Sequence, residues 1–474
     1  MSFSPFLCIH FESVILFIFL TSLLLAQWGR STDPSHLAQN TRRQFHWMAA
    51  VFVLSALVFV PLLSSVSPLL GAELAVGFTL ALLHPVNALC LLVHLLFLRP
   101  WEVIPDNPLL MALPRLLAGT CVVSWVLHPE THRRLTDRSS RAFLLLLCFG
   151  LWLFLTTFVA SDAAAAQADW FNTYFKVLIV FGMSLFFIVD ARGVAELKQT
   201  IVISVVGMIS LALFEFLFFP STGSVYAQRL HSNFTILDPN DLAAVTAMAL
   251  PLVLVPFFRG AGGAGHAARQ LAGLFMTAAS IAAVWYSQSR GALIALFAEI
   301  MGAFTFPDLR RRWFGALALS AFLVLGYFGI LKASTRSLED LGSSSENRSE
   351  FWKAAVNMTL HHPILGVGFD QYPRTYESYS SGNRSEWGER TAHSSWLLAF
   401  AESGLVGGGL FLAFFLTVWR TAWRHRREWP EHLYALLGYG VAMSFLSHTY
   451  LIYPYLLCAL ILASDSVKET ARAA

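Results

Sequence analysis

The stretch "TAHSSWLLAFAESGLVGGGLFLAFFLTVWR", residues 391–420, decides the fold class. Residues 395–419 within it are almost entirely apolar or small. A helix of about 20 such residues is long enough to cross the hydrocarbon core of a bilayer. Because His393 stands directly before this run, the sequence predicts a membrane helix with a chemically versatile side chain at its entrance.

The composition of the whole chain agrees with this interpretation. Of its 474 residues, 56% are hydrophobic and 13% are charged, whereas soluble domains carry roughly 25% charged residues. The chain therefore has too little polar surface for a water-soluble globule. Its net charge of +3 does not suggest nucleic acid as a partner, and its five cysteines show no spacing typical of a disulfide framework or a zinc site.

Similar apolar runs recur along the chain. We predict an all-α fold, a polytopic transmembrane helix bundle of about 12–15 helices with one large loop outside the membrane that contains short amphipathic helices. Four segments are expected: extra N-terminal transmembrane helices (1–85), a transmembrane core (86–331), the large loop (332–394), and C-terminal transmembrane helices with a tail (395–474). The expected spans are 5–27, 47–65, two within 69–98, 109–127, 142–160, 173–189, 200–219, 241–258, 271–286, 291–306, 314–331, 395–419, 433–449 and 451–464.

Lysines and arginines in the loops predict the orientation. Alternate loops are basic, whereas a loop such as 161–172 between them has acidic residues and no Lys or Arg. Basic loops face the cytoplasm in membrane proteins. The large loop and the N-terminus then lie outside, and the C-terminal tail lies inside. The basic loops contain Arg42–Arg43, Arg133–Arg134, Arg310–Arg312 and Arg420–Arg427.

The large outer loop has signals of internal structure. In "NRSEFWKAAVNMTLHHP", residues 347–363, Asn347 and Glu350 form a capping-box pattern that predicts a helix start, and Pro363 predicts its end. Arg348 would then lie in the first turn, where unpaired backbone N–H groups and a guanidinium favour an anion site. An arginine simply solvated at a helix end is the alternative. The helix is expected to lie on the membrane surface through Phe351, Trp352, Ala355 and Met358.

His393 is the strongest candidate for chemistry. The two serines after it are natural N-caps, and the positive end of the helix dipole favours a neutral imidazole, which can accept a proton as a general base. Glu402 lies nine residues further on and about half a turn out of phase, so it is not assumed to orient His393. Gly404 and Gly408 form a GxxxG pattern, which predicts close packing of a neighbouring helix.

Two other outer turns carry candidate binding residues. In "WYSQSRGALIALFAEI" a very short outer turn contains Arg290, which can snorkel to the interface or hold a phosphate group. In "RLHSNFTILDPNDLAA", beginning at Arg229, the residues Asp238, Asn240 and Asp241 are expected to cap the next span, with sugar binding as a further possibility for Asn240.

These motifs together resemble a known family. His393-Ser394, nine residues, and then Gly404-Leu405-Val406-Gly407 resemble the motif of bacterial O-antigen ligases and the related O-antigen polymerases, including O-glycosylation ligases that accompany exosortase systems. "SQSRGALIAL", "NRSEFWKAA", "HPILGVGF" and "DPNDLA" are similar to further family motifs. The resemblance covers roughly residues 200–420, and the extra N-terminal spans depart from it.

The resemblance implies a membrane glycosyltransferase of the bacterial inner membrane that needs no metal and no cofactor. Its donor would be an undecaprenyl-pyrophosphate-linked glycan, and its acceptor a second glycan, lipid A–core or a protein, at an active site facing the periplasm. Arg290 and Arg348 would bind the pyrophosphate, and His393 would activate the acceptor hydroxyl. Arg229, Asn240 and Glu402 are further candidates for substrate binding, although Ser232 replaces a glycine expected after Arg229.

Two alternatives stay open at this point. A transporter or flippase for polysaccharide or lipid-linked glycan would also need many spans and membrane lipid around it. No internal repeat is visible, however, and the polar motifs gather on the outer side rather than in the middle of the membrane. Within the glycosyltransferase reading, the sequence does not separate a ligase from a polymerase, because both need the same donor site.

Overall fold

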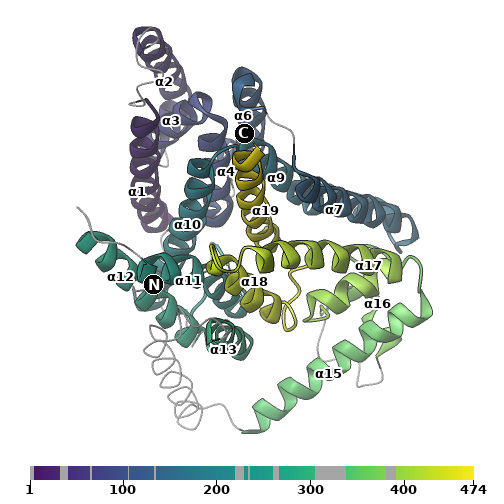
Figure 1. Ribbon diagram of the computed structural model, residues 1–474. Helices are drawn as coiled ribbons and strands as arrows, with labels where there is room; N and C mark the ends of the chain where they lie inside the picture. The colour runs from purple at the N-terminus through teal and green to yellow at the C-terminus, as the bar shows by residue number, and fades with distance from the viewer. Residues whose placement is uncertain are drawn as a thin grey trace. The chain divides into compact units, whose positions relative to one another are not determined.

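The computed structural model describes residues 5–31, 41–63, 67–104, 106–132, 135–218, 229–232, 235–236, 238–259, 266–304, 338–380 and 391–473. Within these ranges the regular elements are α-helices and two short 3-10 helices, without a strand, which confirms the all-α class (Figure 1). The expected span 314–331 lies outside the described residues. The helices of the first half are α1 Pro5–Ser31, α2 Thr41–Leu63, α3 Pro68–Leu83, α4 Pro85–Leu98, α5 Pro100–Val103, α6 Pro108–Leu127, α7 Asp137–Thr156, α8 Ala163–Asn172, α9 Tyr174–Phe187 and α10 Ala191–Phe218.

The second half of the chain is also helical. Its helices are α11 Pro239–Arg259, α12 His266–Ser287, α13 Arg290–Phe304, α15 Leu338–His361, α16 Tyr372–Tyr379, α17 Ser395–Arg424, α18 Pro430–Ala442 and α19 Ile452–Ala473.

Membrane-spanning length is the common property of many of these helices. In the described part of the chain, six helical stretches are long and apolar enough to cross a bilayer, and four shorter apolar helices accompany them. This confirms a polytopic helical bundle. The six stretches are Pro85–Val103, Pro108–Leu127, Asp137–Val159, Ala163–Phe187, Ala191–Phe218 and Ser395–Arg424.

The chain forms two compact units. The first comprises Met1–Arg134, Phe186–Leu242 and Ala278–Ser287, and the second comprises Leu135–Leu185, Ala243–Thr277 and Gln288–Ala474. In the first unit α4 packs against α3, α6 and α10. In the second unit α17 is the central helix, because it contacts α7, α15, α18 and α19, and the helices α15 and α16 of the predicted large loop lie beside it (Figure 1).

One predicted loop is a helix. Residues 161–172 were expected to connect two spans, but α8 occupies Ala163–Asn172 and continues through α9 as one candidate span, Ala163–Phe187. The alanine run favours a helix. Asp162 starts it, because its carboxylate accepts a hydrogen bond from the N–H of Ala165 at 3.0 Å.

The helix α17 is bent at Gly404. This residue has φ +68° and ψ −168°, a conformation essentially restricted to glycine. A turn from the outer loop fills the bend: the N–H of Leu405 donates to the carbonyl of Pro363 at 2.7 Å, and the N–H of Val367 donates to that of Ala401 at 2.9 Å. Gly404 is therefore required by a backbone turn. The GxxxG pattern predicted instead that it allows a neighbouring helix to pack closely.

The chain between α18 and α19 also differs from the expectation. A span was predicted over 433–449, but α18 ends at Ala442 and residues 443–451 form a non-helical loop. Ser395, the first residue of α17, replaces the missing helical hydrogen bonds. Its N–H donates to Met443 O at 2.8 Å, its hydroxyl donates to Leu446 O at 2.6 Å, and that hydroxyl accepts from the N–H of His448 at 2.8 Å. The 443–451 loop is thereby fixed to the start of α17, next to His393.

Candidate functional site

Arg348 lies inside a helix and not at its start. The helix α15 begins at Leu338, ten residues before Arg348, so the predicted start at Asn347 and the anion site in the first turn are wrong. Helical residues continue upstream of the capping-box pattern and override it, so the N–H groups near Arg348 have helical partners. The predicted end is confirmed, because α15 stops at His361, shortly before Pro363.

The apolar face of α15 is covered by protein. Phe351 and Met358, with 5% and 0% of their surface exposed, pack in one cluster with Tyr372, Tyr376 and Leu398. The hydroxyl of Tyr372 donates to the carbonyl of Phe351 at 2.7 Å, and burial raises the pKa of Tyr372. The expected position on the membrane surface is therefore wrong for Phe351, Ala355 and Met358, and it stays a prediction for the half-buried Trp352. The three buried side chains instead attach α15 to α16 and α17, which places Arg348 at a defined position.

Phe445 of the 443–451 loop lies beside Arg348 and beside the residue that follows Arg290. The guanidinium carbon of Arg348 lies 6.0 Å from the centre of the Phe445 ring, a cation–π distance. Gly291, which directly follows Arg290, approaches the same residue so closely that a Cβ built there would lie 3.3 Å from Phe445 Cβ. The start of α13 and the middle of α15 therefore meet at one side chain.

His393 lies in the same neighbourhood. Its ring centre is 5.5 Å from that of Phe351, which is three residues after Arg348 on the same face of α15. Arg290, Arg348 and His393 are each partly exposed. Arg348 and His393 therefore lie beside two phenylalanines, and the residue that follows Arg290 approaches one of them. The catalytic roles of the three residues stay a prediction.

Unusual backbone conformations cluster around these residues. In the described part of the chain, four non-glycine residues have positive φ, and three of them are Gln288 at 53°, Asp370 at 58° and His393 at 45°. Gln288 precedes α13 by two residues, and His393 precedes the N-cap of α17. Such conformations cost free energy and concentrate at functional sites, where the surrounding structure enforces them. The backbone of His393 is held in this conformation by the capped helix that follows it.

Glu402 is the buried anchor of this region. It has 1% of its surface exposed, and its two carboxylate oxygens accept hydrogen bonds from the N–H of Tyr372 at 2.9 Å and from the hydroxyl of Tyr450 at 2.6 Å. These bonds join the bend of α17 to α16 and to the 443–451 loop. These contacts give Glu402 a structural role, and its role in substrate binding stays a prediction.

Arg229 and Asn240 lie together in the first unit. The Nη2 of Arg229 donates to Asn240 Oδ1 at 2.9 Å, and its Nε donates to the carbonyl of Ser287 at 2.8 Å. Asp238 accepts from the backbone N–H of Asn240 at 2.7 Å at the start of α11, as expected for a cap residue. Binding of substrate by Arg229 and Asn240 stays a prediction.

The sequence interpretation missed the 443–451 loop. It was read as part of an apolar span, yet it supplies Phe445 and Tyr450 to the site. Four polar residues interrupt this apolar stretch, and they were an available signal against a continuous helix: Ser444, Ser447, His448 and Thr449.

Metal ligands do not gather at this site in the part of the chain that the structure describes. No group of three or more His, Cys, Asp or Glu side chains there could hold a metal ion. The chemistry that the described side chains can supply is charge neutralisation by two guanidinium groups and proton transfer by one imidazole.

Comparison with known families identifies this region. Residues 275–412 match the family described as O-antigen ligase. The match includes Arg290, Arg348, His393 and Glu402, whereas Arg229 and Asn240 precede it. It confirms the resemblance found from the sequence motifs. Comparison with curated proteins gave no match.

Proposed function

Because the chain carries the O-antigen ligase domain at residues 275–412 and is a multi-pass membrane protein of the ligase and polymerase type, we propose that it transfers a glycan from an undecaprenyl-pyrophosphate donor. The acceptor is a hydroxyl of lipid A–core, of a protein or of a second lipid-linked glycan, on the periplasmic side of the inner membrane. The observation that carries this proposal is the position of Arg348 beside Phe445, of His393 beside Phe351, and of Gly291, the residue after Arg290, beside Phe445.

The two arginines act on the leaving group. When the bond between the anomeric carbon and the pyrophosphate oxygen breaks, negative charge develops on the pyrophosphate. Guanidinium groups that are already in place stabilise this charge without reorganising, and such preorganised electrostatics is usually a large catalytic contribution. Arg348 is held by the packing of α15, and Arg290 is held at the start of α13.

His393 acts on the acceptor. Its imidazole takes the proton of the acceptor hydroxyl while the oxygen forms a bond to the anomeric carbon, and the pyrophosphate leaves with its electron pair. A positioned general base contributes roughly 10²–10⁴-fold to such a step. A single direct displacement inverts the configuration at the anomeric carbon, which the linkage of the product reports.

The test is transfer of a labelled glycan by the purified full-length protein in liposomes. We expect His393→Ala to reduce the transfer rate by roughly 10²–10⁴-fold, and Arg290→Gln and Arg348→Gln to reduce it by a similar factor. His361→Ala and Arg374→Gln are matched controls, because both side chains are exposed on the outer helices α15 and α16. Rates unchanged in the three site variants, with normal melting temperatures, would exclude the proposed roles.

The same assay separates enzyme from transporter. Label in a new covalent linkage supports transfer, whereas label that crosses the bilayer still attached to its original carrier supports transport. Deletion in the source organism then separates the two enzyme classes. Shortened glycans indicate a polymerase, and full-length glycans that stay on the lipid carrier indicate a ligase.

A further inference from the structure

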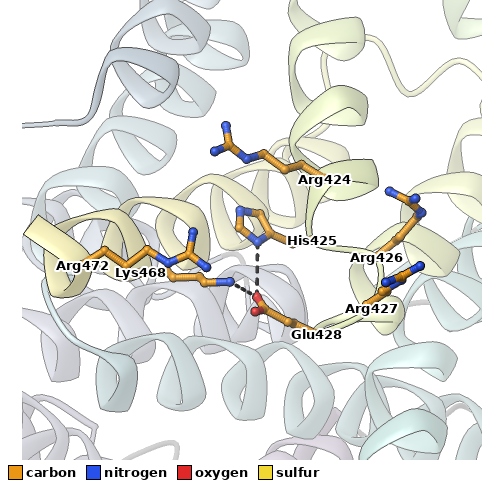
Figure 2. Close-up of a pocket in the computed structure, with 7 residues that line it drawn as sticks. All are labelled: Arg424, His425, Arg426, Arg427, Glu428, Lys468 and Arg472. Carbon is orange, nitrogen blue, oxygen red and sulfur yellow. Dashed lines mark hydrogen bonds and ion pairs between the residues drawn. The ribbon is translucent and has the colours of Figure 1, made fainter.

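A second concentration of positive charge lies at the opposite end of α17 from His393. A cavity of about 430 Å³ is lined there by side chains from the end of α17, from the turn after it and from the last turns of α19 (Figure 2). The lining has five permanent cations and one carboxylate. The cations are Arg424, Arg426, Arg427, Lys468 and Arg472, and the carboxylate belongs to Glu428.

The carboxylate does not neutralise the cavity. Glu428 accepts a hydrogen bond from Lys468 Nζ, and its carboxylate lies 3.3 Å from His425 Nδ1 (Figure 2). The bond from Lys468, with a smaller contribution from His425, lowers the pKa of Glu428. Lys468 therefore balances Glu428. In the described part of the chain, neither Arg424 nor Arg472 forms a salt bridge. The cavity keeps a clear excess of positive charge.

The base of the cavity is fixed by a buried network. His425 Nε2 lies 2.6 Å from Oδ1 of Asp465, whose side chain is fully buried. Nη1 of Arg138 donates to the two oxygens of Asp465 at 2.7 and 2.9 Å. These bonds join the ends of α7, α17 and α19. The turn that carries Arg426 and Arg427 is therefore anchored through His425 to α19 and α7.

An apolar strip leads to the same place. Leu412, Leu416 and Trp423 are spaced four and seven residues apart, which puts them on one face of α17, and they are 42%, 43% and 48% exposed. Exposed Arg420 lies on the same face between Leu416 and Trp423. Arg424 follows directly. A ligand with a phosphate group and acyl chains would use both the strip and the cations, whereas a soluble phosphate compound would use only the cations.

We propose that this cavity binds the phosphate-bearing headgroup of an anionic phospholipid in the cytoplasmic leaflet. The orientation follows from the basic loops, which face the cytoplasm. Juxtamembrane arginines attract anionic headgroups, each with a modest gain that adds over the cluster. The site is separate from the glycosyl-transfer centre and does not depend on the function proposed for it.

The test is native mass spectrometry of the full-length protein in detergent, titrated with phosphatidylglycerol, with phosphatidylcholine, or with soluble glycerol phosphate. The test variant is Arg424→Gln/Arg472→Gln. The control is Arg115→Gln/Arg141→Gln, which removes the same charge from two exposed arginines outside the cavity. We expect the test variant to bind phosphatidylglycerol on the order of tenfold more weakly, and the control to bind it within about twofold of the wild type.

Three results would overturn the proposal. Equal losses in test and control variants would mean that the arginines only complement helix C-termini and set orientation. Equally tight binding of phosphatidylcholine would exclude selectivity for an anionic headgroup. Displacement of the lipid by glycerol phosphate at similar concentrations would identify a soluble phosphate compound as the ligand. Melting temperatures of both variants show that they are folded.

Discussion

Replacement of Gly404 by alanine tests how the outer turn is joined to α17. A Cβ at this position would lie 2.2 Å from the carbonyl oxygen of Ile364 and 2.8 Å from that of Pro363, which are backbone atoms that cannot move alone. The backbone conformation of Gly404 would cost alanine about 1–3 kcal/mol. Separation of the turn also breaks the bonds from Leu405 and Val367, at about 1 kcal/mol each.

If the turn detaches, these contributions together lower the free energy of unfolding by roughly 3–5 kcal/mol. Gly409→Ala is the matched control on the same helix, because no atom lies within 4 Å of its Cβ position. It should be neutral or stabilising by up to about 1 kcal/mol, since alanine favours helix. The assay is thermal melting in detergent, together with proteolytic cleavage of the turn at 363–371 and the glycan-transfer rate.

We expect Gly404→Ala to melt earlier, to be cut faster in this turn and to transfer glycan more slowly, because the turn also carries the chain to α16. Two results would refute the reasoning. One is an unchanged melting temperature with an intact turn in Gly404→Ala. The other is an equal loss in Gly409→Ala, which would show that the bend itself is not the cause.

Three other variants test named contacts. Ser395→Ala leaves the buried Leu446 carbonyl and His448 N–H without the serine hydroxyl and should destabilise the protein by about 1–3 kcal/mol in thermal melting. Tyr450→Phe removes the hydroxyl that donates to buried Glu402 and should cost about 1–3 kcal/mol of stability and slow glycan transfer. Lys468 lowers the pKa of Glu428 in the folded protein. The ionised carboxylate therefore stabilises the protein above its unfolded pKa, and this stabilisation is lost as the pH falls through its folded pKa. The melting temperatures of wild type and E428Q should therefore converge as the pH falls below about 4.

Conservative controls accompany these variants. Ser380→Ala and Tyr379→Phe remove hydroxyls whose hydrogen bonds are exposed, and they should leave the melting temperature nearly unchanged. Losses in the controls as large as in the test variants would contradict the burial argument. A constant difference between wild type and E428Q at every pH would contradict the argument from Glu428.

Local sequence was sufficient for features that depend on neighbouring residues. The apolar run after His393 predicted α17, Pro363 predicted the end of α15, and the serine that follows His393 was correctly interpreted as an N-cap, since its hydroxyl accepts from Leu397 N–H at 3.4 Å. The arginine and histidine motifs pointed to the family that residues 275–412 match.

Features that depend on distant partners were not accessible in this way. The bend at Gly404 needs the turn at 363–367, which is about 40 residues upstream, and the early end of α18 needs the hydroxyl of Ser395, about 50 residues upstream. A GxxxG pattern and an apolar run are equally compatible with straight helices. The predicted start of α15 was wrong although a local cap signal stands at Asn347, because the helix continues upstream of this signal to Leu338.

The attachment of the 443–451 loop to Ser395 has a consequence for biosynthesis. The residues that hold the segment after His393 follow Ser395 by about 50 residues in the chain. A nascent chain that has been made only as far as α17 therefore has His393 but not the contacts that fix the start of this helix. We expect a chain that stops before residue 443 to lose glycan transfer, even though Arg290 and Arg348 are still present.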